Sequence, residues 1–208
     1  MTDNTQKPKL YLTSPMCPSV NHYLAYRGIM KNGKPMAVSY CTNEANSYKK
    51  WLVGYIHDEV KRQNWPLTPN KYQHFYVDTV FYFPRSDMDA SNYFKVMLDA
   101  ITDSHLIWLD DNVACERVQA IYYDIANPRI EICISPVDYI GVFSNAPQLE
   151  LFESKCAECT RSARNCSLLR KAKEGKIQPE IVDGVCSEFK QKKEIKDYGK
   201  NEESRNNE

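Results

Sequence analysis

Two sets of side chains alternate along positions 73–83, in the middle of the chain. Every second residue there suits a buried sheet face, which predicts a long strand with one covered side. The covered positions are Phe75, Val77, Thr79, Phe81 and Phe83. Two more strands are predicted at 117–123 and 129–135, joined as a hairpin through the turn 125–128. The inward face of the second consists of Ile130, Ile132 and Ile134.

Helical periodicity marks two other segments. Thr42 is suited to cap a helix that runs to Gln63, with Glu44 in its first turn. The apolar stripe of this helix is Tyr48, Trp51, Leu52, Tyr55, Ile56 and Val60. A second helix is predicted over 92–102. Its apolar stripe is Phe94, Met97, Leu98 and Ile101. Each helix therefore has one face suited to a core.

A hairpin signal stands out near the N-terminus, after a short strand predicted at 9–13 and a proline-containing loop at 14–23. The pair Asn32-Gly33 is the strongest two-residue signal for a β-hairpin, which we expect to span 26–36. Three cations decorate it, namely Arg27, Lys31 and Lys34. They form either a basic arm that contacts DNA or an ordinary solvated hairpin tip.

The order of these elements predicts an α+β fold. Residues 1–140 form one domain, with a small mixed β-sheet and two main helices on one of its faces. Residues 141–189 comprise a linker, over 141–155, and a cysteine-rich metal-binding module. The polar segments 1–8 and 190–208 contain too few apolar residues to fold, and we expect both to be disordered.

Composition narrows the possible functions. The chain has 208 residues with 27 basic and 27 acidic side chains, so its formal net charge is +0 and any contact with DNA must use local patches. It has no apolar signal segment and no run of membrane-spanning length, which predicts a cytoplasmic protein. Its eight cysteines, in such a compartment, argue against a disulfide framework.

Carboxylates gather around one lysine within residues 83–112. The acids are Asp87, Asp89, Asp99, Asp110 and Asp111, and the lysine is Lys95. The first two precede the helix 92–102, whose N-terminus favours anions. The last two end the apolar run 106–109, which we expect to hold them on a rigid edge close to that helix start. Mg²⁺ takes one or two protein carboxylates together with phosphate oxygens, so the pattern predicts a metal-dependent phosphodiester hydrolase.

Each charged side chain of this segment has an expected role. The metal ligands are Asp89, Asp110 and Asp111, with Asp87 as a further candidate. Lys95 contacts the scissile phosphate as a point charge, and Arg85 clamps a neighbouring phosphate through two hydrogen bonds. Asp99 lies four residues after Lys95 and is expected to pair with it along the helix.

The run Asp-x-x-Asn-x-x-Lys-x-x-x-Asp-Ala that starts at Asp89, followed by an apolar stretch and an Asp-Asp pair, resembles the RusA family of Holliday junction resolvases. The element Pro18–Tyr23 is similar to a second motif of that family, and the resemblance covers residues 9–137. It implies a homodimeric, Mg²⁺-dependent endonuclease that resolves four-way DNA junctions in recombination and repair. Its catalytic residues would be Asp89, Asp111 and Lys95, and Asn21 would contact DNA.

One position departs from the family pattern. The family has a second Asp directly before Asn92, where this chain has Ser91. Either the site has lost a ligand, or Asp87 supplies it through a two-residue shift. We favour the ungapped alignment, because Asn92, Lys95 and Asp99 keep their helical phase.

Two other functions remain open. In the first, the change at Ser91 has removed activity, and the chain is a non-catalytic DNA-binding or regulatory protein on the same scaffold. In the second, it is a metal-dependent nuclease of another specificity, which keeps the site and changes the substrate. Cleavage of junction and duplex DNA distinguishes the three.

Half of the cysteines cluster near the C-terminus. They are Cys156, Cys159, Cys166 and Cys186. Four thiolates that begin with C-x₂-C spacing suit a tetrahedral Zn²⁺ site, and an iron–sulfur cluster uses the same ligands. Zinc is preferred because it is commoner in small modules of this kind. The segment between the cysteines is basic, which indicates a nucleic-acid contact. Its cations are Arg161, Arg164, Arg170, Lys171, Lys173 and Lys176.

Overall fold

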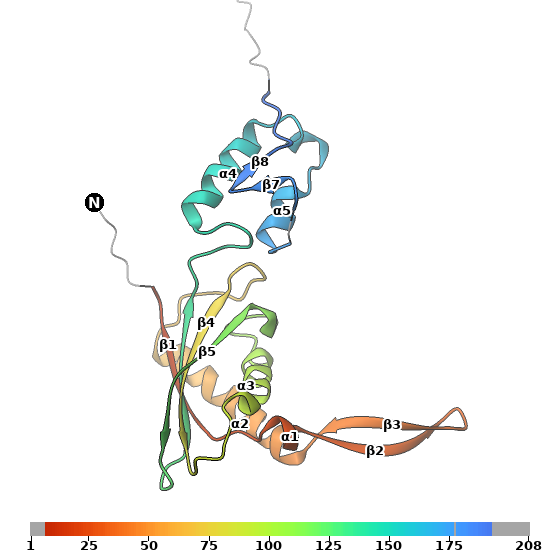
Figure 1. Ribbon diagram of the computed structural model, residues 1–208, viewed down its shortest axis with the longest axis vertical. Helices are drawn as coiled ribbons and strands as arrows, with labels where there is room; N and C mark the ends of the chain where they lie inside the picture. The colour runs from red at the N-terminus through yellow and green to blue at the C-terminus, as the bar shows by residue number, and fades with distance from the viewer. Residues whose placement is uncertain (1–6, 177, 193–208) are drawn as a thin grey trace, which may run out of the picture.

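A four-stranded sheet lies at the centre of the computed structural model, which describes residues 7–176 and 178–192 (Figure 1). Its strand order is β1-β6-β4-β5. The strands are β1 Leu10–Pro15, β4 Phe75–Phe83, β5 Ala114–Tyr123 and β6 Arg129–Pro136. β4 runs parallel to β5 and antiparallel to β6, and β6 is antiparallel to β1. The sheet is therefore mixed, as predicted.

The predicted hairpin of β5 and β6 is wrong, because β4 lies between them. Val77 pairs with Glu116 of β5 on one side and with Ile134 of β6 on the other. The alternation of β4 is complete, with every second residue buried, whereas most side chains of β5 are exposed. The more apolar strand takes the inner position and β5 takes the edge. A short connection favours a hairpin in sequence, but here the chain steps across one strand instead.

Two helices cover one face of this sheet (Figure 1). They are α2 Asn43–Arg62 and α3 Ser91–Asp103, so both predicted helices are confirmed. α3 carries the chain from β4 to β5, because two parallel strands need a crossover connection. The expected cap of α2 is also present, since Thr42 Oγ1 accepts a hydrogen bond from Ala45 N at 3.3 Å.

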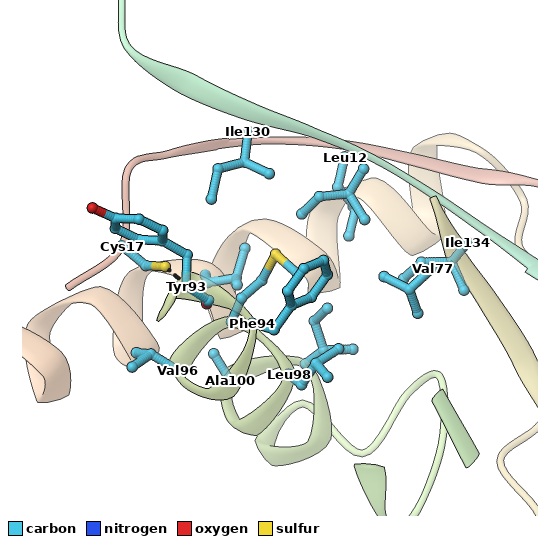
Figure 2. Packing of buried hydrophobic residues seen from close by; sticks show 14 of the residues in the cluster. Leu12, Cys17, Val77, Tyr93, Phe94, Val96, Leu98, Ala100, Ile130 and Ile134 are labelled. Carbon is cyan, nitrogen blue, oxygen red and sulfur yellow. Dashed lines mark hydrogen bonds between the residues drawn. The ribbon is translucent and has the colours of Figure 1, made fainter. Parts of the chain in front are cut away.

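One hydrophobic core fills the space between the sheet and these helices (Figure 2). Phe94 and Leu98 of α3 belong to the same buried cluster as Val77 and Ile134 of the sheet. The predicted inward face of β6 is confirmed at Ile130, Ile132 and Ile134, which are at most 2% exposed.

The apolar stripe of α2 departs from the prediction at two positions. Trp51, expected to be buried, is 44% exposed and stacks on Tyr55 with ring centroids 5.3 Å apart. Glu59 is buried instead, and its carboxylate accepts hydrogen bonds from Arg62 and Gln63. A carboxylate can be buried when such donors compensate for its lost hydration.

The segment before β5 is not the strand end that we expected. Residues 106–109 form irregular turns around Trp108, which is fully buried and donates from Nε1 to Thr102 Oγ1 at 2.7 Å. The short 3₁₀ helix η1 Asp111–Val113 follows and leads into β5. The acidic pair therefore precedes a strand, and a buried indole rather than a sheet edge determines its position.

Residues 24–41 form a two-stranded arm of β2 Leu24–Lys31 and β3 Lys34–Cys41. Asn32 and Gly33 have φ values of 51° and 75°, as a type I′ turn requires. The hairpin prediction is confirmed, and the strands are longer than expected. The loop predicted before the arm contains the short helix α1 Val20–Tyr23.

A smaller unit follows the sheet. Its elements are α4 Ala146–Glu158, η2 Ser162–Arg164, α5 Leu168–Lys173, β7 Ile181–Val182 and β8 Val185–Cys186. α4 occupies most of the expected linker 141–155, which corrects that prediction. Its N-terminus is stabilised by Asn145, whose Oδ1 accepts a hydrogen bond from Gln148 N at 2.9 Å. Of the segments expected to be disordered, 1–6 and 193–208 lie outside the described residues.

No helix in the described ranges is both long and apolar enough to cross a membrane. All eight cysteines are described, and each of them is a free thiol.

The central position of β6 can be tested by comparing two truncations. We expect Ile132→Ala to lower the free energy of unfolding by about 2–5 kcal/mol, because it removes a fully packed side chain. Val118→Ala on the exposed side of the edge strand β5 should change it by no more than about 0.5 kcal/mol. Urea denaturation followed by circular dichroism measures both, and similar losses for the two variants would contradict this strand order.

Candidate active site

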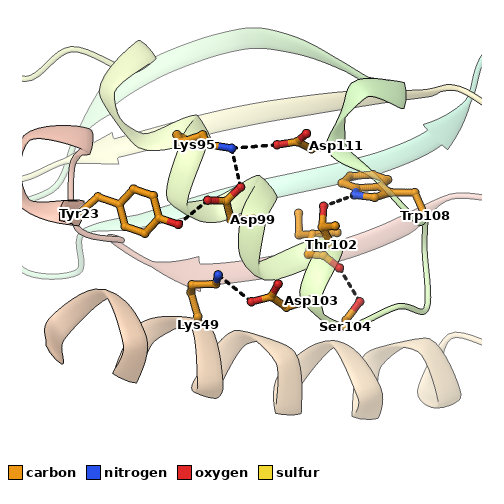
Figure 3. Close-up of polar contacts among 10 residues, drawn as sticks. Tyr23, Lys49, Lys95, Asp99, Thr102, Asp103, Ser104, Trp108 and Asp111 are labelled. Atoms are coloured by element: carbon orange, nitrogen blue, oxygen red, sulfur yellow. Dashed lines mark hydrogen bonds and ion pairs between the residues drawn. The ribbon is translucent and has the colours of Figure 1, made fainter. Parts of the chain in front are cut away.

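A lysine held between two carboxylates forms the centre of the candidate site (Figure 3). Lys95 Nζ donates to Asp99 Oδ1 at 2.6 Å and to Asp111 Oδ2 at 3.2 Å. The other oxygen of Asp99 accepts a hydrogen bond from the Tyr23 hydroxyl at 2.6 Å. The side chain of Lys95 is 53% exposed, whereas that of Asp99 is largely covered. The ammonium is thus held from the protein side and remains accessible from solvent.

Local structure explains how these side chains meet. Lys95 and Asp99 lie one turn apart on α3, and the predicted i, i+4 pair is confirmed. Asp111 reaches them through the anchored turn that follows α3. Asp110 stabilises that turn, because its Oδ1 accepts a hydrogen bond from Asn112 N at 3.0 Å.

The N-terminal element 18–23 reaches the same place. Tyr23 is buried at the end of α1, and its pKa is raised, first by burial and then by its bond to Asp99. The hydroxyl therefore stays protonated and can donate to the carboxylate. Asn21, the expected DNA contact, is exposed on the same short helix. The structure thus joins the two segments that carry the family resemblance.

The electrostatics of the cluster keep Lys95 charged. Its pKa is raised, first by the hydrogen bond to Asp99 and further by Asp111. Glu116, at the start of β5, is a further member that the sequence did not reveal. Partial desolvation raises its pKa, the nearby Asp111 raises it further, and Lys95 lowers it. Glu116 is a single acid in a strand and belongs to no motif, so only its position five residues after Asp111 could have indicated it.

The acids at the start of α3 lie outside the lysine cluster. Asp89 Oδ1 accepts a hydrogen bond from Ser91 N at 3.0 Å and so stabilises the first turn of the helix. Asp87 pairs with Arg85 at 2.8 Å, and both are exposed, so the expected phosphate clamp is engaged by a carboxylate. Burial raises the pKa of Tyr93, and Asp87 and Asp89 raise it further, which places both carboxylates near that phenol.

The expected metal ligands are not gathered into one cluster. Within the ranges that the structure describes, no three His, Cys, Asp or Glu side chains are arranged to hold a metal ion. The donors available here are nonetheless carboxylate oxygens, which suit a hard cation such as Mg²⁺. The repulsion of Glu116 by Asp111 is of the kind that a bound cation relieves. The residues present therefore fit the predicted ion in charge and in donor type.

The cysteines of the C-terminal unit line a separate cavity of about 360 Å³. Cys156, Cys159, Cys166 and Cys186 all border it. Cys159 Sγ accepts a hydrogen bond from Lys190 N at 3.4 Å. The pKa of Cys156 is raised to about 11, first by burial and then by the other three thiols. The four predicted cysteines are close together, but among the described side chains they do not form an assembled coordination site.

Most cations of the basic cysteine segment are paired with acids. The pairs are Arg161–Glu188, Arg170–Glu174, Lys173–Glu153 and Lys176–Glu174. These contacts neutralise much of the charge that the sequence offered for binding nucleic acid. The unit is therefore a weaker candidate for a DNA contact than its composition predicted.

Replacing Asp99 tests how the lysine is held. In Asp99→Asn the Lys95 pKa should fall, because the bond that raises it most is weakened. The stabilising contribution of Lys95 is complete below the ordinary lysine value of 10.5 and is lost as pH rises through the higher folded-state value. NMR titration of the lysine ammonium measures this pKa. The control is Asp103→Asn. Asp103 lies on α3 with Lys95 but pairs with Lys49 of α2, so its replacement should leave the Lys95 pKa unchanged. An unaltered Lys95 pKa in Asp99→Asn would contradict the arrangement.

Comparison with known proteins agrees with this geometry. A family model described as endodeoxyribonuclease RusA matches residues 15–135, more than half of the chain. None of the curated proteins that were compared matches it. The matched range includes Tyr23, Lys95, Asp99 and Asp111 and ends before the cysteine-rich unit. The chain belongs to the RusA family of endodeoxyribonucleases.

Proposed function

We propose that this protein is a Mg²⁺-dependent endonuclease that resolves four-way DNA junctions by hydrolysing one phosphodiester bond in each of two strands. The observation that supports this most directly is the cluster of Lys95, Asp99 and Asp111, because it presents an exposed ammonium beside carboxylates. It lies within the range that matches the family.

Lys95 binds the scissile phosphate in this mechanism. Its raised pKa keeps it protonated, and its exposed ammonium can donate to a non-bridging phosphate oxygen. Of the two hydrogen bonds that Lys95 donates, the shorter goes to Asp99, which therefore holds the lysine in place. Tyr23 in turn orients Asp99. Asp111 makes the longer bond at 3.2 Å and is the carboxylate that can turn away from Lys95.

Asp111 and Asp89 are the proposed Mg²⁺ ligands, with Asp110 and Asp87 as further candidates. A bound Mg²⁺ would neutralise charge on the phosphate and lower the pKa of the attacking water. Glu116 lies near Asp111 and can accept a hydrogen bond from a water there. Asp89 lies at the exposed start of α3, outside the lysine cluster. To share an ion with Asp111, its carboxylate would have to turn towards that cluster.

A homodimer completes the proposal. Two symmetric strands of a junction need two equivalent sites, and a two-fold dimer supplies them. Recognition of a branched substrate then depends more on its shape and phosphates than on base edges.

Removing either proposed ligand should abolish cleavage without preventing binding. We expect Asp111→Asn and Asp89→Asn to reduce the rate by roughly a hundredfold or more, since loss of a group that merely orients a ligand already costs about 10–100-fold. Asp58→Asn on the outer face of α2 is the matched control and should cleave normally. Cleavage of labelled junctions with Mg²⁺ gives the rates, and gel shifts without Mg²⁺ give the affinities.

Asp87 and Ser91 determine how the site is built. In the ungapped alignment Asp87→Asn has little effect and Ser91→Asp raises the rate by restoring a ligand. If Asp87 supplies that ligand, its loss is as severe as that of Asp89, and Ser91→Asp gives no gain. Full activity in Asp89→Asn would contradict both versions of the site. Binding without cleavage by the wild-type protein would favour the non-catalytic function. Equal cleavage of junction and linear duplex would instead favour a nuclease of other specificity.

We also propose that the four clustered cysteines bind one Zn²⁺ ion. They border one cavity, and Cys159 is oriented by the backbone of Lys190. Among the described residues, the fully buried cluster of this unit consists of Phe143, Leu149, Phe152 and Ala172. So small a core rarely stabilises a unit alone, and a structural metal is one common supplement.

Elemental analysis of the purified protein should find about one zinc per chain. Cys159→Ser should lose that zinc and make the unit sensitive to limited proteolysis, because metal binding contributes directly to folding. Cys115→Ser, on β5 of the nuclease domain, should keep both zinc and resistance. Iron and sulfide in place of zinc would assign an iron–sulfur cluster, and the absence of any metal would refute the site.

A further inference from the structure

Beyond its base, the β2–β3 arm has no sheet or helix packed along it among the residues that the structure describes. Figure 1 shows it extending away from the domain, with its turn at the far end. Each strand has eight residues, so at about 3.3 Å per residue the arm reaches roughly 26 Å. A two-stranded hairpin is only marginally stable on its own in water, so a partner along its surface would stabilise it.

The pairing register separates the side chains of the arm into two different faces. Directly opposed residues of two antiparallel strands point to the same face, and successive residues alternate. One face contains Ala25, Arg27, Ile29, Lys31, Lys34, Met36, Val38 and Tyr40. The other contains Leu24, Tyr26, Gly28, Met30, Pro35, Ala37, Ser39 and Cys41. All three cations of the arm therefore share one face, and the opposite face has no charge.

Contacts within the arm agree with this division. The Arg27 guanidinium lies over the Tyr40 ring, 5.7 Å from its centroid, as expected for diagonal neighbours on one face. Residues 24–41 include no acid, so the arm has a formal charge of +3 in a chain whose net charge is +0. This charge favours phosphates as the partner of that face.

The uncharged face leaves Leu24 partly exposed and two larger side chains mostly in solvent. Tyr26 is 72% exposed and Met30 is 69% exposed. Aromatic and thioether groups gain most from a flat apolar partner, and the face of a nucleobase is one. In continuous duplex DNA those faces are stacked, whereas a branch point interrupts the stack.

We infer that the arm is the element that distinguishes branched from linear DNA, with its basic face on the phosphates and Tyr26 and Met30 against bases at the branch point. This inference rests on the proposed function and specifies how the same site selects its substrate. The basic face contributes affinity for any DNA, and the uncharged face contributes selectivity for the branch.

The base of the arm directly adjoins the candidate active site. Leu24, the first residue of β2, directly follows Tyr23, which holds Asp99. Thr42 N donates to Tyr23 O at 3.0 Å and closes the base of the arm. A branch bound along the arm would therefore lie beside the element that holds Asp99. The arm of a second copy of this chain is a poorer partner, because two arms with a charge of +3 each repel each other.

The test compares affinities for a four-way junction and a linear duplex of the same arms, measured by fluorescence anisotropy without Mg²⁺. Tyr26→Ala should weaken junction binding roughly tenfold and leave duplex binding unchanged, because base–aromatic stacking contributes about this much. Tyr26→Phe keeps the ring and should bind both as the wild type does. Tyr123 on β5 is also largely exposed, at 62%, so Tyr123→Ala is the matched control and should change neither affinity.

The cations should behave differently from Tyr26. Alanine at Arg27, Lys31 and Lys34 should weaken junction and duplex binding alike, and each lost phosphate contact should lower the salt slope by about 1. Equal loss on both DNAs in Tyr26→Ala, or no loss on either, would overturn the inference. So would a lower sedimentation coefficient for Tyr26→Ala without DNA, which would assign the face to a second copy of the chain.

The same measurements keep the two proposals separate. A wild-type protein that cleaves junctions while Tyr26→Ala behaves identically contradicts the inference about the arm alone. A wild-type protein that neither binds nor cleaves junctions contradicts the proposed function itself.

Discussion

The ion pairs of Lys95 with Asp99 and Asp111 hold the candidate site together. In the part of the chain that the structure describes, Lys95 is the cation placed among the Asp99, Asp111 and Glu116 carboxylates, and without it these acids would repel one another. The same cluster connects α1, α3 and the turn before β5, since Tyr23 binds the far oxygen of Asp99. Segments that are distant in sequence are thus linked through the Lys95 ammonium, and this ion-pair network contributes to their relative positions.

The crossover from β4 to β5 explains why the charge lies where it does. A parallel pair requires the chain to return along the sheet, and α3 makes that return with its apolar side on the core and Lys95 at the edge. Trp108 then anchors the descending turn to Thr102, which delivers Asp111 to the lysine. The geometry of the candidate site is therefore a consequence of how the sheet is connected.

Charge is distributed unevenly over the parts of this protein. The charged side chains of the arm are all cations, whereas those of the candidate site are mostly acids. In the C-terminal unit most of the cations are paired with acids. A net charge of zero therefore conceals a basic arm beside an acidic site. Under the proposed function this division is useful, because the arm would attract the polyanion while the site would retain carboxylates for a metal.

Local patterns in the sequence determined the secondary structure and the residue types of the site. Thr42 caps its helix and Asn32-Gly33 makes its turn, because each depends on near neighbours alone. The alternation of β4 was also readable in the sequence, because a period of two is typical of a strand with one covered face. Only the tertiary structure decided that β4 separates β5 from β6 and that Glu116 joins the site. Strand pairing and burial depend on competition among distant segments, and one sequence pattern is compatible with several outcomes of that competition.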